Sequence, residues 1–251
     1  MGINSLADKN IRIGIIDTGI SSTNYSMISR SIIGGHNFSL DGTGRHHIKA
    51  ETYHGFAVAS IILKVAPKAK LVIAKVLNDK GEGNPKRTAE GIRYCISKKC
   101  HIINCSIAGP HDPDLEDAVN EAYSKGIVIV GATGNDGRNR LLYPASYTNC
   151  IGVGACDKYN KLAKFSNYNI FMDLIAFGDE VKITTKEGII IDRGTSFSAP
   201  LVTGELALLR QRFELRYNRP PKCDELKNML LKKCIFNPSV DPIEQGNGYL
   251  G

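Results

Sequence analysis

The stretch that decides the fold is Ile-Arg-Ile-Gly-Ile-Ile-Asp-Thr-Gly, residues 11–19. Apart from Arg12, its first part is apolar up to Ile16, and it closes with Asp17-Thr18-Gly19. A short apolar run that ends in a polar, Gly-containing turn is typical of a strand buried on both faces of a parallel sheet. Four further apolar runs repeat this pattern, at residues 71–76, 102–105, 127–130 and 151–153. The sequence therefore predicts a core of buried parallel strands.

Helical patterns lie between these strands. One helix face is formed by apolar residues at positions i, i+3, i+4, i+7 and i+8, namely Leu115, Ala118, Val119, Ala122 and Tyr123. Residues 88–98 repeat this spacing. Alternating strands and helices predict an α/β fold with three α/β/α layers and a mostly parallel central sheet. An antiparallel hairpin is expected near the end, with strands at 181–184 and 189–191.

The composition favours one large domain. The 251 residues are 42% hydrophobic and 23% charged, and no linker, repeat or block of charge divides them. We therefore expect a single domain over residues 1–251. The net charge is +7, but Lys and Arg are spread along the chain. Because nucleic-acid binding needs basic groups gathered on one surface, no nucleic-acid partner is expected.

Targeting signals are missing from the sequence. Its start, Met1 to Ser5, lacks the charged and apolar regions of a signal peptide. No apolar run approaches the roughly 18 residues of a membrane span. Seven cysteines, an odd number, show no disulfide framework. These features predict a cytoplasmic protein with no membrane partner, although a trimmed secreted form would look the same.

Asp17 is the first residue with a chemical interpretation. A carboxylate that leaves a buried strand needs a charged or hydrogen-bonding partner. One alternative is a turn or helix cap made by Asp17-Thr18-Gly19. Another is an aspartic protease, whose active-site turn has the same three residues. That chemistry requires two such carboxylates, and no second Asp-Thr-Gly or Asp-Ser-Gly occurs.

His54 and Ser196 each lie where a helix is expected to begin. His54 is followed at once by Gly55, which leaves room beside the imidazole. Ser196 follows Gly194-Thr195 and precedes the helical segment up to Phe213. A Ser at this place is either a plain helix cap or a nucleophile, since the free N–H groups of a helix start also stabilise an oxyanion.

Three motifs, in their order along the chain, resemble the signatures of the subtilisin-like (subtilase) serine proteases. They are Asp17-Thr18-Gly19, His54-Gly55 and Gly194-Thr195-Ser196-Phe197-Ser198-Ala199-Pro200. The order Asp, His, Ser is that of subtilisin and differs from the order in chymotrypsin. The intervals of 37 and 142 residues fit as well. Residues 104–109, 132–135, 143–145 and 151–155 also resemble segments of the family. The resemblance therefore runs from about Ile11 to the end of the chain.

The resemblance implies a serine endopeptidase that works through an acyl-enzyme. By this likeness Ser196 is the nucleophile, His54 is the general base and acid, and Asp17 orients His54. Asn135 is implied to complete the oxyanion hole. The enzyme would act generally or as a processing enzyme for peptide precursors.

The family's way of binding substrate implies an extended peptide added as a strand. The matching residues here are Ser106, Ile107, Ala108 and Gly109, together with the segment near Asn78 to Gly83. Asp136 and Leu142 are expected near the pocket for the residue before the scissile bond (P1). An acid there would favour Lys or Arg as the P1 residue of the substrate, whereas Leu142 would make the pocket shallow. The sequence alone does not decide between these two preferences.

Departures from the family pattern add three expectations. Phe56-Ala57 replaces the usual Thr-His after His-Gly, which makes the wall behind His54 more apolar. The interval from Phe56 to Lys64 lacks the calcium-binding loop of secreted bacterial subtilisins, so we expect no cofactor and activity without calcium. Only 16 residues precede Asp17, so no prodomain is expected in this chain.

Two alternatives remain open from the sequence. Cys95, Cys100, His101 and Cys105 are close along the chain and are soft metal ligands. However, Cys95 belongs to a helix face and Cys105 to a buried strand, so no metal site is predicted. The second alternative is a catalytically silent peptide-binding module on the same scaffold. It would normally show a broken triad, and here all four residue types are present.

Overall fold

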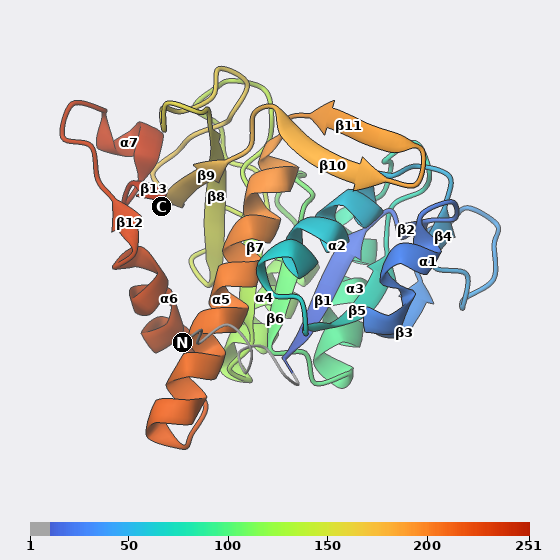
Figure 1. Cartoon of the computed structure of the whole chain (residues 1–251). Coiled ribbons are helices and arrows are strands. Elements are labelled where there is room, and N and C mark those ends of the chain that lie inside the picture. The colour runs from blue at the N-terminus through green and yellow to red at the C-terminus, as the bar shows by residue number, and fades with distance from the viewer. Residues whose placement is uncertain (1–10) are drawn as a thin grey trace.

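A computed structural model describes residues 11–251 and places a nine-stranded sheet at the centre of the molecule (Figure 1). The strand order is β12-β13-β9-β8-β7-β6-β1-β5-β3. In chain order the strands are β1 (Arg12–Asp17), β3 (Ile32–Asn37), β5 (Lys70–Lys75), β6 (Ile102–Cys105), β7 (Val128–Ala132), β8 (Cys150–Cys156), β9 (Met172–Phe177), β12 (Cys234–Ile235) and β13 (Tyr249–Leu250). All neighbours pair in parallel except β12 and β13, which pair antiparallel.

Long helices cover both faces of the sheet. On one face α2 (His54–Val65) and α5 (Thr195–Tyr217) pack against each other and against the strands, while α3 (Pro85–Ser97) and α4 (Pro113–Ser124) cover the other. The two faces have separate apolar cores because β1 alternates: Ile13 and Ile15 belong to the first, and Ile16 belongs to the second. The predicted three-layer α/β/α fold with a mostly parallel sheet is confirmed.

The remaining elements are short or peripheral. They are β2 (Ile20–Ser21), α1 (Tyr25–Ile28), the 3₁₀ helix η2 (Ser29–Ser31), β4 (Lys49–Ala50), β10 (Val181–Thr185), β11 (Gly188–Asp192), α6 (Cys223–Leu231) and α7 (Pro242–Gln245). β10 and β11 form the predicted antiparallel hairpin, which lies outside the central sheet. β11 leads directly into the segment before α5, so the hairpin lies next to Ser196 along the chain.

The strand predictions agree with the structure to within a few residues. β6 has the predicted bounds, and β8 extends the predicted run on both sides. β3 and β9 were not predicted: β3 contains two glycines and two polar residues, and β9 carries Asp173 within an otherwise apolar run. The expected single domain over residues 1–251 stays a prediction. Its first ten residues, and the expected lack of a signal sequence at Met1 to Ser5, lie outside the described residues.

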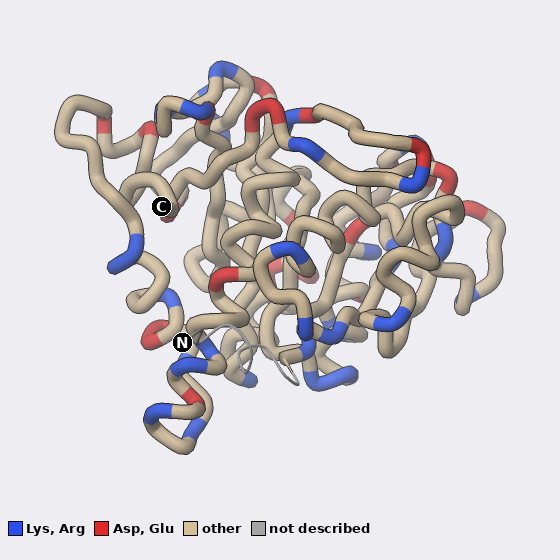
Figure 2. The backbone as a smooth tube through the Cα atoms, in the orientation of Figure 1, with Lys and Arg blue, Asp and Glu red and all other residues tan. Residues whose placement is uncertain are grey.

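Charged residues of both signs are mixed over the backbone (Figure 2). Lys and Arg occur in most parts of the fold, with Asp and Glu between them, as the sequence suggested. The expected absence of a nucleic-acid partner stays a prediction. Among residues 11–251, no helix combines the length and apolarity needed to cross a bilayer. All seven cysteines are free thiols, and six of them are buried.

Candidate active site

Asp17 is the last residue of β1, and its side chain is fully buried. Its Oδ1 accepts hydrogen bonds from the backbone N of Thr18 at 2.7 Å and from Thr18 Oγ1 at 3.1 Å. The same oxygen lies 2.8 Å from Nδ1 of His54. Within residues 11–251 the other oxygen, Oδ2, has no hydrogen-bond partner. The carboxylate is thus held in one orientation, with its charge directed at the imidazole.

His54 is the first residue of α2 and comes within reach of Asp17 because of Gly55. A Cβ at residue 55 would lie 2.0 Å from the carbonyl oxygen of Gly19 and 3.1 Å from Asp17 Oδ1. Only glycine permits this approach without a shift of the backbone. The Gly55 N–H donates to Thr18 Oγ1 at 3.2 Å, which fixes the start of α2 to the end of β1.

Two opposing effects set the protonation of His54. Burial lowers its pKa, and the adjacent Asp17 carboxylate raises it, with a smaller contribution in the same direction from Asp192; the net pKa lies above the usual value of 6.5. Because an ionised carboxylate only accepts hydrogen bonds, Nδ1 of His54 carries the proton in the bond to Asp17. In the neutral imidazole Nε2 is therefore the acceptor, as a general base requires.

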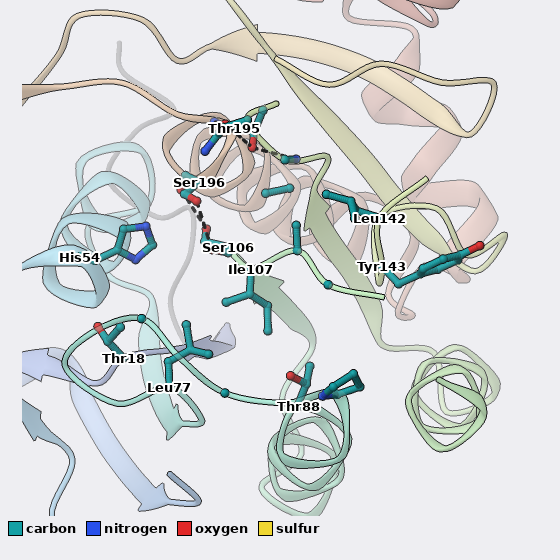
Figure 3. Close-up of a pocket in the computed structure, with 18 of the residues that line it drawn as sticks. Thr18, His54, Leu77, Thr88, Ser106, Ile107, Leu142, Tyr143, Thr195 and Ser196 are labelled. Atoms are coloured by element: carbon teal, nitrogen blue, oxygen red, sulfur yellow. Dashed lines mark hydrogen bonds between the residues drawn. The ribbon is translucent and has the colours of Figure 1, made fainter. Parts of the chain in front are cut away.

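Ser196 lies in the first turn of α5 and lines the same end of the cleft as His54 (Figure 3). Its Oγ donates to the backbone carbonyl of Ser106 at 3.1 Å, and Ser106 Oγ donates in return to the carbonyl of Ser196 at 2.8 Å. Among the hydrogen bonds of the described residues, none joins this hydroxyl to His54. The Ser196 hydroxyl must therefore leave the Ser106 carbonyl and turn towards the imidazole before its proton can be taken.

Asn135 follows β7 and faces the same cleft. Its Oδ1 accepts from the backbone N of Thr195 at 2.9 Å and from Thr195 Oγ1 at 3.0 Å. Thr195 Oγ1 also accepts from the backbone N of Gly134 at 3.1 Å. Since the oxygen of the amide is held by Thr195, its NH₂ group points to the opposite side. Asn135 Nδ2 is therefore free to donate to an oxyanion in the cleft.

One cleft of about 630 Å³ collects the predicted site residues (Figure 3). Besides His54, Asn135 and Ser196, its walls include the predicted substrate residues Ser106, Ile107, Ala108, Gly109, Asp136 and Leu142. Asp17 does not line the cleft and lies behind His54. The predicted second edge is present as well, since Asp79, Lys80, Gly81 and Gly83 form part of the opposite wall.

The acid expected near the P1 pocket does not carry an isolated charge. Asp136 Oδ2 lies 2.9 Å from Arg140 NH1 and 3.3 Å from Asn167 Nδ2. The hydrogen bond from Asn167 and the pair with Arg140 hold the pKa of Asp136 below its usual value. The side chain is ionised and its charge is balanced, so electrostatics alone gives weak support to a preference for Lys or Arg.

Three site-supporting residues were missed by the sequence analysis. Asn167 is fully buried, accepts from the backbone N of Asp136 at 2.9 Å and donates to the carbonyl of Thr133 at 3.2 Å. Thr195 orients Asn135, and Tyr53 bonds to Asp192. No local sequence pattern predicts a role for Asn167 or Tyr53, because their hydrogen-bond partners are 31 and 139 residues away along the chain.

The cysteines considered as metal ligands have ordinary packing roles. Cys95, Cys100 and Cys105 belong to the core between α3, α4 and the sheet, where burial raises the pKa of Cys105. Nδ1 of His101 accepts from the backbone N of Arg12 at 3.0 Å. No group of three or more His, Cys, Asp or Glu side chains that could hold a metal ion occurs in the part of the chain that the structure describes.

Comparison with known proteins gives one consistent result. A sequence model described as the subtilase family, Peptidase S8, matches residues 8–245. The major intracellular serine protease of Bacillus subtilis (strain 168) is 35% identical over 96% of this chain and 81% of its own length. An intracellular serine protease of Paenibacillus polymyxa is also 35% identical, over 98% of this chain and 80% of its own. Among solved structures, the prenylagaramide maturation protease PagA superposes with a TM-score of 0.84 at 26% identity and covers 99% of this chain and 92% of its own.

Proposed function

The chain belongs to the subtilase family of serine proteases, and on that premise we propose that it is an endopeptidase with Ser196 as its nucleophile. One observation carries this proposal: His54, Ser196 and Asn135 line the same cleft. Nδ1 of His54 lies 2.8 Å from Asp17 Oδ1, and the amide of Asn135 is oriented by Thr195. His54 would take the Ser196 proton as the hydroxyl attacks the scissile carbonyl, and would then deliver it to the leaving amine. Asp17 would stabilise the imidazolium formed between these steps.

The oxyanion would be stabilised at the start of α5. The first N–H groups of a helix have no partner within the helix, and here that of Thr195 is used by Asn135. The N–H of Ser196 and Nδ2 of Asn135 would then donate together to the negatively charged oxygen. The positive end of the α5 dipole adds to the same effect.

The test of this proposal is labelling with a fluorophosphonate probe combined with an assay on a fluorogenic peptide. We expect covalent labelling at Ser196, turnover of the peptide, and the loss of both in Ser196→Ala, with the circular dichroism spectrum unchanged. Retained peptidase activity in pure Ser196→Ala protein contradicts the assignment.

The competing function is a catalytically silent peptide-binding module, and the hydrogen bond of the Ser196 hydroxyl to the Ser106 carbonyl favours it. A folded, unlabelled parent protein that still binds peptides would support it.

We propose that substrate peptides lie extended along Ser106 to Gly109. Ile107 is half-buried and Ala108 is exposed at the cleft wall, so these two residues are the ones offered to an added strand, whereas the N–H and C=O of Gly109 are already paired with Tyr143. The balanced charge of Asp136 together with Leu142 supports an apolar P1 residue. Cleavage of a peptide library tests this, and Arg140→Gln should raise cleavage after Lys and Arg by freeing the charge of Asp136. The same library separates a narrow processing enzyme from a general one.

We also propose activity without calcium. Asp79 of the cleft wall and the neighbouring Asp41 already have an internal cation: Lys75 is 1% exposed, and its Nζ lies 2.8 Å from Asp41 Oδ2 and 3.8 Å from Asp79 Oδ1. Nζ also donates to the carbonyl of Lys49 at 2.9 Å. Chelation should leave turnover unchanged, and a loss that only Ca²⁺ restores would contradict the proposal.

A location inside the cell is proposed on two grounds. Both curated relatives named above are called intracellular serine proteases. The seven cysteines are all free thiols, which a reducing compartment preserves. Fractionation of the source cells, with the protease detected by the fluorophosphonate probe, tests this location. Recovery of the labelled protein only from the culture medium would contradict it.

A further inference from the structure

Tyr53 and Asp192 form a hydrogen bond that no part of the proposed mechanism uses. Tyr53 directly precedes His54, and its hydroxyl donates to Asp192 Oδ2 at 2.5 Å. Asp192 is the last residue of β11 and stands four residues before Ser196. The bond therefore joins the two segments that carry the proposed base and nucleophile, although the two residues are 139 positions apart.

The Asp192 carboxylate is held from both sides. While Oδ2 accepts from Tyr53, Oδ1 accepts from the backbone N of Arg193 at 2.7 Å. Across the hairpin, Asp192 is paired with Val181 of β10. The nearest basic side chain along the chain is turned away, since the guanidinium of Arg193 stacks on the ring of Phe165 at 5.7 Å. The charge of Asp192 is thus fixed in place and is not cancelled by its neighbour.

Two carboxylates act on the imidazole of His54 from different elements. Asp17, at the end of β1, contacts Nδ1 directly, and Asp192, at the end of β11, acts from a greater distance in the same direction. The Phe197 ring of α5, 5.7 Å from the imidazole, is uncharged. Burial and the hydrogen bond to Asp192 raise the pKa of Tyr53 to about 12, so Tyr53 stays a donor at any working pH.

We propose that Tyr53 and Asp192 are positioning residues of the active site, a role that rests on the proposed function. Their hydrogen bond holds the start of α2 against the segment that carries Ser196. The Asp192 carboxylate is a second negative charge, after Asp17, that stabilises the imidazolium of His54. We call this pair of residues the Tyr53–Asp192 clasp.

Two variants separate the two roles of the clasp. Asp192→Asn keeps an oxygen that accepts from Tyr53 and removes the charge. The acid limb of the kcat/KM profile should move to lower pH by about half a unit, less than the 1–3 units produced by a contacting charge. Tyr53→Phe keeps the charge and removes the bond. Its acid limb should stay in place or move slightly upward, while kcat falls by about three- to tenfold because His54 is less well placed.

The chain supplies a matched control. Tyr123 donates to Asp224 Oδ1 at 2.9 Å, between α4 and α6 and away from the cleft residues. Tyr123→Phe and Asp224→Asn remove the same type of bond and charge, and neither should change kcat or the acid limb. Equal effects of the control and clasp variants would assign both bonds to stability alone and overturn the proposal.

A direct titration distinguishes failure of the clasp from failure of the proposed function. The His54 imidazole is followed by NMR in the parent protein and in Asp192→Asn, with His54→Gln to identify its signals. A lower pKa in Asp192→Asn supports the charge role even in a protein without peptidase activity. An acid limb and an NMR titration that both coincide with those of the parent overturn it. Absence of labelling and turnover in the parent refutes the proposed function instead.

Discussion

The helices on the two faces of the sheet begin in different ways. α3 and α4 start with local caps: Asn84 accepts from the N of Arg87 and Asp112 from the N of Leu115, each at 3.0 Å, with proline following in both cases. Neither α2 nor α5 has a side-chain cap from its own N-cap residue. The His54 N–H reaches the nearby Thr52 Oγ1 at 3.4 Å, but the N–H groups of Gly55 in α2 and Thr195 in α5 are bonded by distant residues.

These long-range caps coincide with the chemistry. Gly55 of α2 donates to Thr18, and Thr195 of α5 donates to Asn135, so each cap ties a helix to the loop that follows a strand. A local cap stabilises a helix wherever it lies, whereas a long-range cap also fixes the helix relative to its neighbours. The two helix starts that depart from the local pattern are those that carry His54 and Ser196, the proposed base and nucleophile.

The strongest test of the comparison changes the cap of α5. Asn135→Ala removes both the acceptor for Thr195 and the proposed oxyanion donor, and kcat should fall by about 10²–10³-fold. Asn135→Asp keeps an acceptor for Thr195 and loses the donor, so its kcat should fall at least as far while its thermal stability stays closer to the parent. Kinetics and melting curves of both variants provide the measurement. A near-normal kcat in Asn135→Asp would contradict the proposal that Asn135 donates to the oxyanion.

The next test concerns the close approach of α2 to the end of β1. Gly55→Ala places a methyl group 2.0 Å from the Gly19 carbonyl, so the start of α2 must move. We expect a loss of about 3 kcal/mol in the free energy of unfolding. The kcat should fall further than this loss of stability alone explains, because His54 moves with the start of α2. Gly44→Ala is the control, because a Cβ there meets nothing within 4 Å. A Gly55→Ala variant with the parent's stability would show that the approach is not required.

A local cap should affect stability alone. Asp112→Ala removes the acceptor for Leu115 N and should cost about 1 kcal/mol in urea unfolding. Because Asp112 does not line the cleft, kcat and KM should stay at the parent values. A clear fall in kcat of Asp112→Ala would contradict the proposed difference between local caps, which affect stability alone, and long-range caps, which also affect catalysis.

The smallest expected effect is a pH-dependent stability contribution of His54. Its pKa is raised in the folded protein, since Asp17 outweighs burial, so protonation favours the folded state. This contribution is complete below the unfolded value of about 6.5 and disappears as the pH rises through the folded pKa. His54→Gln should therefore cost more stability at about pH 5 than at about pH 9, by less than about 1 kcal/mol. An equal cost at both pH values would contradict the raised pKa.

Local patterns account for the fold class and for the residues that gather in the cleft. The apolar run before Asp17 predicts a buried strand, and the parallel topology then places its carboxyl end beside that of β6 and on the same edge of the sheet as that of β7. The ordered motifs around Asp17, His54 and Ser196 supply the rest through resemblance to a family. β3 escaped prediction because its glycines and polar residues break the apolar run, and its burial depends on pairing with β5.

The supporting contacts were beyond a sequence-based prediction for a different reason. Tyr53 and Asp192, Asn167 and Asp136, or Thr203 and Asn104 at 2.8 Å, have no spacing rule, because each pair is set by how distant segments pack. Individually each of these residues has an ordinary local interpretation. Only the three-dimensional arrangement distinguishes the tyrosine beside the imidazole from the other nine tyrosines of the chain.

The reciprocal hydrogen bonds between Ser106 and Ser196 have a consequence for the enzyme between turnovers. With its proton directed at a backbone carbonyl, the hydroxyl of Ser196, the proposed nucleophile, is held idle and makes no hydrogen bond to the imidazole. In the proposed mechanism such a resting arrangement would slow accidental reaction and self-digestion. The carbonyl that holds the idle hydroxyl belongs to the segment proposed to receive the peptide. Arrival of a substrate and release of the nucleophile would then be one event.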